Sequence, residues 1–115
     1  MTVLYGIPNC DTVAKARRWL DDNQISYQFH DLRKDGLEQT QVSHWLQTLG
    51  AEQLINKRST TWKQLSDSDR QAALSEMAAS ILLAHPTLIK RPLLAMRDSL
   101  HCGFKEVDYQ RLFQK

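Results

Sequence analysis

The sequence is poor in cysteine, proline and glycine, with two, three and four of them in 115 residues. Two cysteines without a Cys-x-x-Cys pair are too few for a structural zinc site, and the four histidines lack ligand spacing, so we expect no bound metal. The remaining composition, 42% hydrophobic and 24% charged, excludes a fibrous or disordered chain. A net charge of +2 is too small to indicate direct binding to nucleic acid.

Long apolar runs are also absent. No stretch approaches the roughly 18 apolar residues of a membrane span. The chain enters strand-like residues 3–5 without the basic region and apolar core of a signal peptide. We therefore expect a cytoplasmic protein that makes no membrane contact. Thiols stay reduced in that compartment, so Cys10 and Cys102 are not expected to form a permanent disulfide.

The hydrophobic pattern predicts the order βαβ, a helical segment, then ββα. Strands are predicted at residues 2–5, 25–29, 93–96 and 100–102, and the short βαβ connection implies that the first two are parallel. Helices are predicted at residues 11–22 and 105–113, where apolar residues recur with helical spacing. This order indicates the α/β class, with a thioredoxin/glutaredoxin-like mixed four-stranded sheet.

Between about residues 37 and 85 the strand signals vanish, which predicts a helical insertion in a single domain that covers residues 1–115. Residues 55–62 are polar and lack periodicity, as in a loop. Two apolar stripes with helical spacing lie on either side of this loop. The first consists of Val42, Trp45, Leu46 and Leu49, and the second of Leu74, Met77, Ala78, Ile81 and Leu82.

Cys10 stands where the first strand ends and the first helix begins, in the run YGIPNCDT at residues 5–12. The first backbone N–H groups of a helix lack intrahelical partners, and the helix dipole adds positive charge there. Both effects favour thiolate, the nucleophilic form, although the adjacent anion Asp11 opposes them. We predict that Cys10 is a catalytic nucleophile, and a buried structural cysteine is the alternative.

Three segments resemble the ArsC (arsenate reductase) family, and more closely its small bacterial YffB-type branch, which is related to Spx. They are residues 5–12 with the following helix, LINKRST at 54–60 and HPTLIKRP at 85–92. The resemblance spans nearly the whole chain and implies one ArsC-like domain with a thioredoxin fold. It also implies that Cys10 attacks an oxyanion or a mixed disulfide, that glutathione or glutaredoxin completes turnover, and that no cofactor is bound.

The resemblance further assigns residues that would bind the substrate. Arg91 matches a family arginine that precedes a cis-proline, which implies that Pro92 is cis and faces Cys10. Arg91 and Arg58 would hold the anion or the substrate's carboxylates, because a guanidinium offers a planar fork of donors and stays charged. Arsenate reductases of the family have a third arginine near the last strand, but residues 101–105 contain none. In a gap-free comparison Asn56 stands opposite their second arginine. Because fewer fixed cations stabilise a trianionic transition state less, both departures count against arsenate as the substrate.

Rival functions differ in the residues that they require. A thiol phosphatase needs a Cys-x5-Arg loop, but position 16 is Ala16 and the arginine comes at Arg17. A cysteine hydrolase needs a histidine base, and the sequence nominates none. Spx relatives are non-enzymatic adaptors that bind RNA polymerase and sense oxidation with a Cys-x-x-Cys switch. Val13 stands at the second cysteine of that switch, so the switch is missing, while binding to RNA polymerase stays open as the alternative.

Together with these residues, the resemblance implies a glutathione-dependent thiol/disulfide reductase that uses one cysteine. The Cys10 thiolate attacks a glutathione mixed disulfide, such as a glutathionylated substrate, and free glutathione as co-substrate resolves the enzyme-bound disulfide. Asn9 and Thr12 are candidates for polar contacts with the substrate at the start of the helix. Cys102 is expected to be a packed strand residue outside the chemistry.

Overall fold

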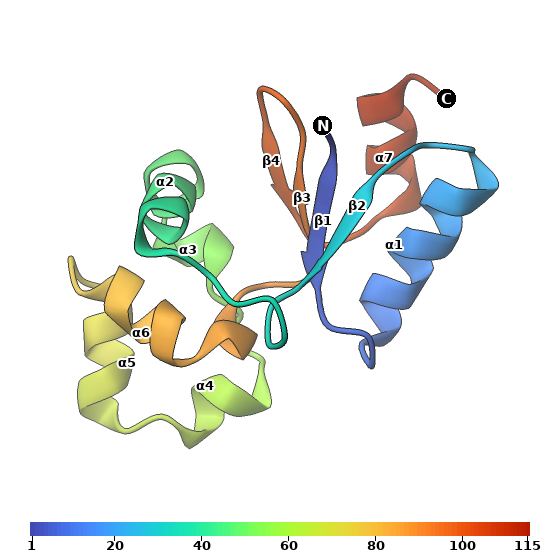
Figure 1. Ribbon diagram of the computed structural model, residues 1–115. Helices are drawn as coiled ribbons and strands as arrows, with labels where there is room; N and C mark the ends of the chain where they lie inside the picture. Colours follow the sequence, from blue (N-terminus) through green and yellow to red (C-terminus); the bar gives the residue numbers. More distant parts are fainter. The chain divides into compact units, whose positions relative to one another are not determined.

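The computed structural model describes residues 1–115, and the chain divides into two compact units. The first unit comprises Met1–Asp31 and Arg91–Lys115, and the second comprises Leu32–Lys90. The sheet belongs to the first unit, and a group of short helices forms the second (Figure 1). The second unit, Leu32–Lys90, starts before and ends after the helical insertion predicted at residues 37–85.

A mixed four-stranded sheet with the order β2-β1-β3-β4 is the frame of the first unit. Strand β1 (Val3–Gly6) pairs in parallel with β2 (Gln28–Asp31) and antiparallel with β3 (Leu93–Ala95). Strand β3 pairs antiparallel with β4 (Leu100–Cys102). The predicted thioredoxin-like sheet is confirmed, including the parallel arrangement of its first two strands.

Helices α1 (Asp11–Asp22) and α7 (Glu106–Phe113) lie beside each other on one side of the sheet (Figure 1). Helix α1 has the predicted bounds, because apolar residues at helical spacing make a continuous buried stripe on it, and α7 begins one residue later than predicted, at Glu106. The rings of Trp19 and Tyr109 meet edge to face, with centroids 5.6 Å apart. The core of this unit consists of Leu4, Ala16, Trp19, Leu20, Leu94 and Tyr109.

The second strand begins later than the alternating pattern of residues 25–29 predicts. Gln24 has a left-handed backbone, with φ 58°, and the Ile25 N–H donates to the Leu20 carbonyl oxygen at 2.9 Å. This arrangement is a Schellman end of helix α1, in which the chain reverses on an αL residue. Because Ile25 terminates the helix, strand pairing starts only at Gln28, opposite Val3.

The second unit is helical, as predicted. Its elements are α2 (Gln39–Leu49), α3 (Ala51–Leu54), α4 (Thr60–Gln64), α5 (Asp67–Ala73), α6 (Ala78–Ala84) and the 3-10 turn η1 (Pro86–Leu88). Fully buried apolar side chains in these elements include Val42, Leu54, Ala73, Leu82 and Leu88. In both units together, every helix falls short of the length and apolar character needed to cross a membrane.

The prediction of one continuous apolar helical stripe through residues 74–82 is wrong. The chain leaves the helical conformation between α5 and α6, and Leu74 and Met77 are 42% and 54% exposed. The Ser75 hydroxyl donates to the Ala72 carbonyl oxygen at 2.7 Å and accepts from the Met77 N–H at 3.1 Å. A serine hydroxyl that bonds the local backbone competes with the helical hydrogen bonds, so the helix is interrupted here.

The prediction that residues 55–62 form a loop is also wrong in its last part, because α4 begins at Thr60. The Ser59 side chain accepts a hydrogen bond from the Trp62 N–H at 3.1 Å, which makes Ser59 the N-cap of this helix. Serine is among the preferred N-cap residues because its oxygen satisfies an otherwise unpaired N–H group. A capped helix of a single turn is too short to produce a visible hydrophobic period.

Candidate functional site

Cys10 occupies the N-cap position of α1, as the sequence predicts. Its backbone is extended, with φ −118° and ψ 123°, and its carbonyl oxygen accepts the first helical hydrogen bond, from the Ala14 N–H at 2.9 Å. The Cys10 side chain makes no capping hydrogen bond, is half-buried and forms no disulfide. The thiol is therefore at the end of the helix where the first N–H groups lack intrahelical partners.

A close approach between β1 and α1 fixes the turn that carries Cys10. A Cβ atom on Gly6 would lie 2.8 Å from Cγ2 of Val13, which is shorter than side-chain contacts allow. Val13 is itself fully buried. Glycine at the end of β1 thus lets the first turn of the helix pack directly against the strand, and this contact holds both ends of the intervening turn.

Asn9 and Thr12 flank Cys10 in sequence. Asn9 is exposed and Thr12 is half-buried. Both residues are within the turn and first helical turn that surround the thiol. Their polar contact with a substrate stays a prediction.

The Arg91–Pro92 peptide bond is cis, as the resemblance implied. Strand β3 starts directly after it, and Leu93 pairs with Tyr5 near the end of β1. The turn to Cys10 leaves β1 at this same end, so the fold brings Cys10 and the Arg91–Pro92 peptide to one end of the sheet. Arg91 is half-buried and Pro92 is buried. That Pro92 faces Cys10 stays a prediction.

The sequence analysis missed Gly103, which contacts this peptide. Its N–H donates to the Pro92 carbonyl oxygen at 2.8 Å, and its φ of 82° lies in the left-handed region that favours glycine. A glycine directly after the last strand was the available signal. Gly103 fixes the carbonyl of the residue that the family pattern marks as part of the site.

Arg58 lies in the second unit, in the segment that precedes α4. It is exposed, and its backbone N–H donates to Oδ1 of Asn56 at 3.0 Å. The Asn56 amide therefore supports the turn that carries Arg58. Of the two residues that the gap-free comparison left open, Arg58 is the one with an exposed side chain, because Asn56 is half-buried.

Backbone hydrogen bonds join the segments that lead to Arg58 and to Arg91. The Lys90 N–H donates to the Leu54 carbonyl oxygen, and the Asn56 N–H donates to the Leu88 carbonyl oxygen, both at 2.8 Å. Ile55 and Ile89 form an antiparallel bridge between these bonds. Residues 54–56 and 88–90 are distant in sequence, and this ladder makes them neighbours.

Two titratable side chains lie on or against β4, at the edge of the sheet. Burial lowers the pKa of His101 from its ordinary value, and the charge of Asp108 opposes that effect. Burial raises the pKa of Tyr109, and the charge of Cys102 adds to the increase. Cys102 is half-buried and is paired with Leu93 in the sheet, consistent with a packed strand residue.

The structure contains no group of three His, Cys, Asp or Glu side chains that could hold a metal ion. The groups that the fold brings to this end of the sheet include the Cys10 thiol at the start of α1 and the Arg91–Pro92 peptide. A thiol in such a setting can act as a nucleophile towards sulfur, and a guanidinium can bind carboxylates or oxyanions.

Comparison with known proteins identifies relatives along the entire chain. A model described as the ArsC family matches residues 5–112. An uncharacterized protein of Haemophilus influenzae is 42% identical over 98% of this chain and 99% of its own length. The solved structure of the YFFB (PA3664) protein is 35% identical, with a TM-score of 0.87, and covers 96% of this chain and 97% of that one. The global transcriptional regulator Spx of Lactiplantibacillus plantarum is 28% identical over 100% of this chain and 88% of its own.

Proposed function

Because the chain belongs to the ArsC family, we propose that it is a glutathione-dependent thiol/disulfide reductase with Cys10 as its single nucleophile. One observation carries the proposal. Cys10 is a free, half-buried thiol at the start of α1, at the end of the sheet to which the Arg91–Pro92 peptide also runs. A nucleophilic thiol at the same end of the sheet as an arginine suits an anionic disulfide such as a glutathione adduct.

The reaction consists of two thiol–disulfide exchanges. In the first, the Cys10 thiolate attacks the glutathione sulfur of a mixed disulfide; a Cys10–glutathione bond forms, and the substrate sulfur leaves as a thiolate that takes a proton. In the second, the thiolate of free glutathione attacks the sulfur of that bound glutathione. Oxidised glutathione leaves, and the Cys10 thiolate is restored. The substrate disulfide is reduced, two glutathione moieties are joined, and no second thiol of the protein takes part.

Arg91 is proposed to bind a carboxylate of the glutathione moiety. A guanidinium donates two parallel hydrogen bonds to a carboxylate and remains charged at neutral pH. The backbone around Pro92 offers polar groups to the peptide bonds of glutathione, and Asn9 and Thr12 contribute further polar contacts. Glutaredoxin is proposed as a further partner that can complete turnover.

Arg58 is proposed as a second cation that binds a substrate carboxylate. It lies in one of the three segments that carry the family resemblance, and the ladder at residues 54–56 ties that segment to the one preceding Arg91. Arsenate is not proposed as the substrate, because residues 101–105 lack the third arginine of arsenate reductases. A cytoplasmic location is proposed, because the reaction consumes reduced glutathione.

Turnover of the mixed disulfide of glutathione and 2-mercaptoethanol tests this proposal, with glutathione as reductant and oxidised glutathione as the measured product. Wild type and Cys102→Ser are expected to turn over, and Cys10→Ser is expected to be inactive with unchanged circular dichroism. Turnover by folded Cys10→Ser at the wild-type rate would contradict the nucleophile assignment. Inactive wild-type protein would contradict the proposed function.

A non-enzymatic, Spx-like adaptor is the second candidate function, favoured by the full-length match with Spx regulators. Val13 stands at the second position of the Spx Cys-x-x-Cys switch and is fully buried against Gly6. Because valine has no thiol, the adaptor would act without that switch. A pull-down that recovers RNA polymerase, together with inactivity towards glutathione mixed disulfides, would favour this candidate over the reductase.

A further inference from the structure

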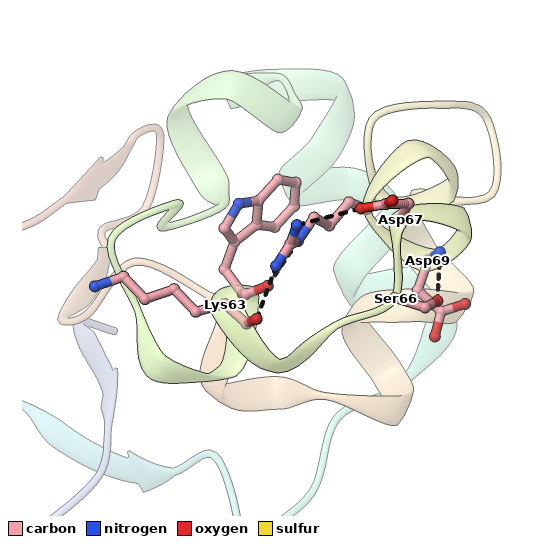
Figure 2. Close-up of polar contacts among 6 residues, drawn as sticks. Lys63, Ser66, Asp67 and Asp69 are labelled. Atoms are coloured by element: carbon pink, nitrogen blue, oxygen red, sulfur yellow. Dashed lines mark hydrogen bonds and ion pairs between the residues drawn. The ribbon is translucent and has the colours of Figure 1, made fainter.

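Arg70 of α5 makes an unusual set of contacts with the end of the neighbouring helix α4 (Figure 2). Its Nε donates to the Trp62 carbonyl oxygen at 3.1 Å, and its Nη2 donates to the Lys63 carbonyl oxygen at 2.7 Å. Nη1 contacts Oδ1 of Asp67 at 3.4 Å. One half-buried guanidinium thus bonds two successive backbone carbonyl groups and one carboxylate.

These contacts supply donors to carbonyl groups at the end of a short helix: the Lys63 carbonyl oxygen accepts from Arg70, and the Trp62 carbonyl oxygen accepts from both Arg70 and the Leu65 N–H, the latter at 3.2 Å. Helix α4 has five residues, and the last four carbonyl groups of any helix lack intrahelical donors. Isolated helices of this length are unstable in water. The planar fork of the Arg70 guanidinium matches two adjacent carbonyl oxygens, and Arg70 itself stands on α5, whose start is capped by Ser66. Arg70 therefore acts as a C-terminal clamp for α4.

The other end of α4 is the turn that carries Arg58. The Ser59 hydroxyl accepts from the Trp62 N–H and donates to the Asn56 carbonyl oxygen at 2.8 Å. The Asn56 side chain in turn accepts from the Arg58 N–H. Trp62 belongs to both sets of bonds, since its N–H is held by Ser59 and its carbonyl oxygen by Arg70. A continuous path of hydrogen bonds thus leads from Arg70 to the backbone of Arg58.

A third contact holds the middle of the same helix. The hydroxyl oxygens of Thr61 and Thr87 lie 2.6 Å apart and join α4 to η1. The ring of Trp62 has the Arg70 guanidinium and the Lys57 ammonium each 6.0 Å from its centroid. Helix α4 is thus held by Ser59 at its start, by Thr87 of η1 through Thr61, and by Arg70 of α5 at its end.

We propose that Arg70 is a positioning residue for Arg58: by clamping the end of α4, it holds the turn from which the Arg58 side chain binds the substrate carboxylate. This inference rests on the proposed function, which gives Arg58 its role. Loss of the clamp frees α4 to fray, and Arg58 then loses a fixed geometry but keeps its charge. Affinity for glutathione-linked ligands falls, while the chemistry of Cys10 does not depend on Arg70.

Binding of S-methylglutathione, which cannot undergo disulfide exchange, to the isotope-labelled full chain tests the proposal by NMR titration. Arg70→Gln and Arg58→Gln are each expected to weaken binding about tenfold, as for loss of one charge-assisted contact. The double variant is expected to bind no more weakly than Arg58→Gln alone, because the two residues act through one contact. Arg111→Gln removes the same charge from the exposed face of α7 and is expected to bind as wild type does.

A second readout separates positioning from general stability. Amide hydrogen exchange at Arg58 and Trp62 is expected to accelerate in Arg70→Gln, while exchange within α1 stays at the wild-type rate. Ser59→Ala removes the cap at the opposite end of α4 and is expected to weaken ligand binding and to accelerate exchange at Arg58 and Trp62, as Arg70→Gln does. The rate at which the neutral reagent iodoacetamide alkylates Cys10 is expected to be unchanged in both variants.

These outcomes distinguish failure of the positioning role from failure of the proposed function. Wild-type affinity in folded Arg70→Gln, or losses that add up in the double variant, would overturn the positioning role and leave the reductase intact. Absence of both binding and turnover in wild type would overturn the proposed function, and the positioning role with it. If Arg70→Gln fails to fold, Arg70→Lys decides: an ammonium cannot reproduce the fork, so about threefold weaker binding is expected, and wild-type binding would overturn the inference.

Discussion

The Lys90 N–H donates a hydrogen bond to the Leu54 carbonyl oxygen at 2.8 Å. This bond joins two segments that the sequence singled out separately, residues 54–60 and residues 85–92. Residues 55 and 89 continue the contact as an antiparallel bridge. Two of the three segments that carry the family resemblance are therefore parts of one local structure, because they are hydrogen-bonded to each other.

Arg91→Ala is expected to raise KM for the mixed disulfide of glutathione and 2-mercaptoethanol by about tenfold, because a charge-assisted contact with the substrate carboxylate is lost. Steady-state kinetics with varied mixed disulfide measures the effect. Arg97→Ala is the matched control, since Arg97 is exposed in the turn between β3 and β4. Equal KM values for Arg91→Ala and wild type would remove Arg91 from the binding site.

Gly6→Ala is expected to lower the free energy of unfolding by about 1–3 kcal/mol, the usual cost of overpacking. The added methyl group would lie 2.8 Å from Cγ2 of Val13, so strand and helix must separate. Urea denaturation measures the loss.

Val13→Ala provides the matched test of that clash. In a Val13→Ala background the Cγ atoms are gone, so the additional effect of Gly6→Ala is expected to shrink, and the two changes couple in a double-mutant cycle. Additive effects would show that the contact between Gly6 and Val13 does not limit the approach of β1 and α1.

Met77→Ala and Leu82→Ala form a matched pair on the second apolar stripe. Met77 is 54% exposed, so its truncation is expected to change the free energy of unfolding by less than about 0.5 kcal/mol. Leu82 is fully buried, and its truncation is expected to cost about 2–5 kcal/mol. Chemical denaturation of both variants measures the difference. A loss in Met77→Ala as large as that in Leu82→Ala would contradict the exposed position of Met77.

The sequence predicts those parts of the fold whose signals are local. Helix α1 has the predicted bounds because its buried apolar residues recur at helical spacing from Val13 to Leu20. The break between α5 and α6 was missed because a serine hydroxyl, rather than a change of hydrophobic period, interrupts the helix. The start of β2 was misplaced because Ile25 alternates like a strand residue but bonds back to helix α1.

The candidate site likewise has features that the sequence predicts and features that it does not. The position of Cys10 follows from a strand, a turn and a helix that are consecutive in sequence. The clamp by Arg70 could not be predicted, because its partners are backbone carbonyl groups, which leave no mark in the sequence. Gly103 acts on the Pro92 carbonyl through its backbone conformation, which the residue type permits but does not specify.

Stability is expected to fall as the pH drops through the titration range of histidine, and His101 contributes to that fall. Burial lowers the pKa of His101 in the folded protein below its ordinary value of 6.5. Below about pH 6.5 the unfolded chain therefore binds a proton that the folded chain still excludes, and protonation favours unfolding. Above that pH both states are neutral, and His101 has no effect of this kind.

His101→Gln removes this titration and retains a polar group that can bond Ser99, whose hydroxyl is 3.0 Å from Nε2. The urea midpoint of wild type is expected to fall more between pH 7 and pH 5.5 than that of the variant, where these two pH values bracket the ordinary pKa of histidine. Identical pH dependence of the two proteins would show that His101 has equal proton affinity in both states.

Mass spectrometry after incubation with oxidised glutathione shows whether Cys10 is the reactive thiol of this protein. We expect the native protein to gain one glutathione moiety, peptide mapping to place it on Cys10, and added reduced glutathione to remove it. Cys10→Ser is expected to gain none. Two results would contradict the assignment of Cys10 as the nucleophile. One is an adduct on Cys102 alone, and the other is a native protein that stays unmodified under conditions in which oxidised glutathione modifies a small free thiol.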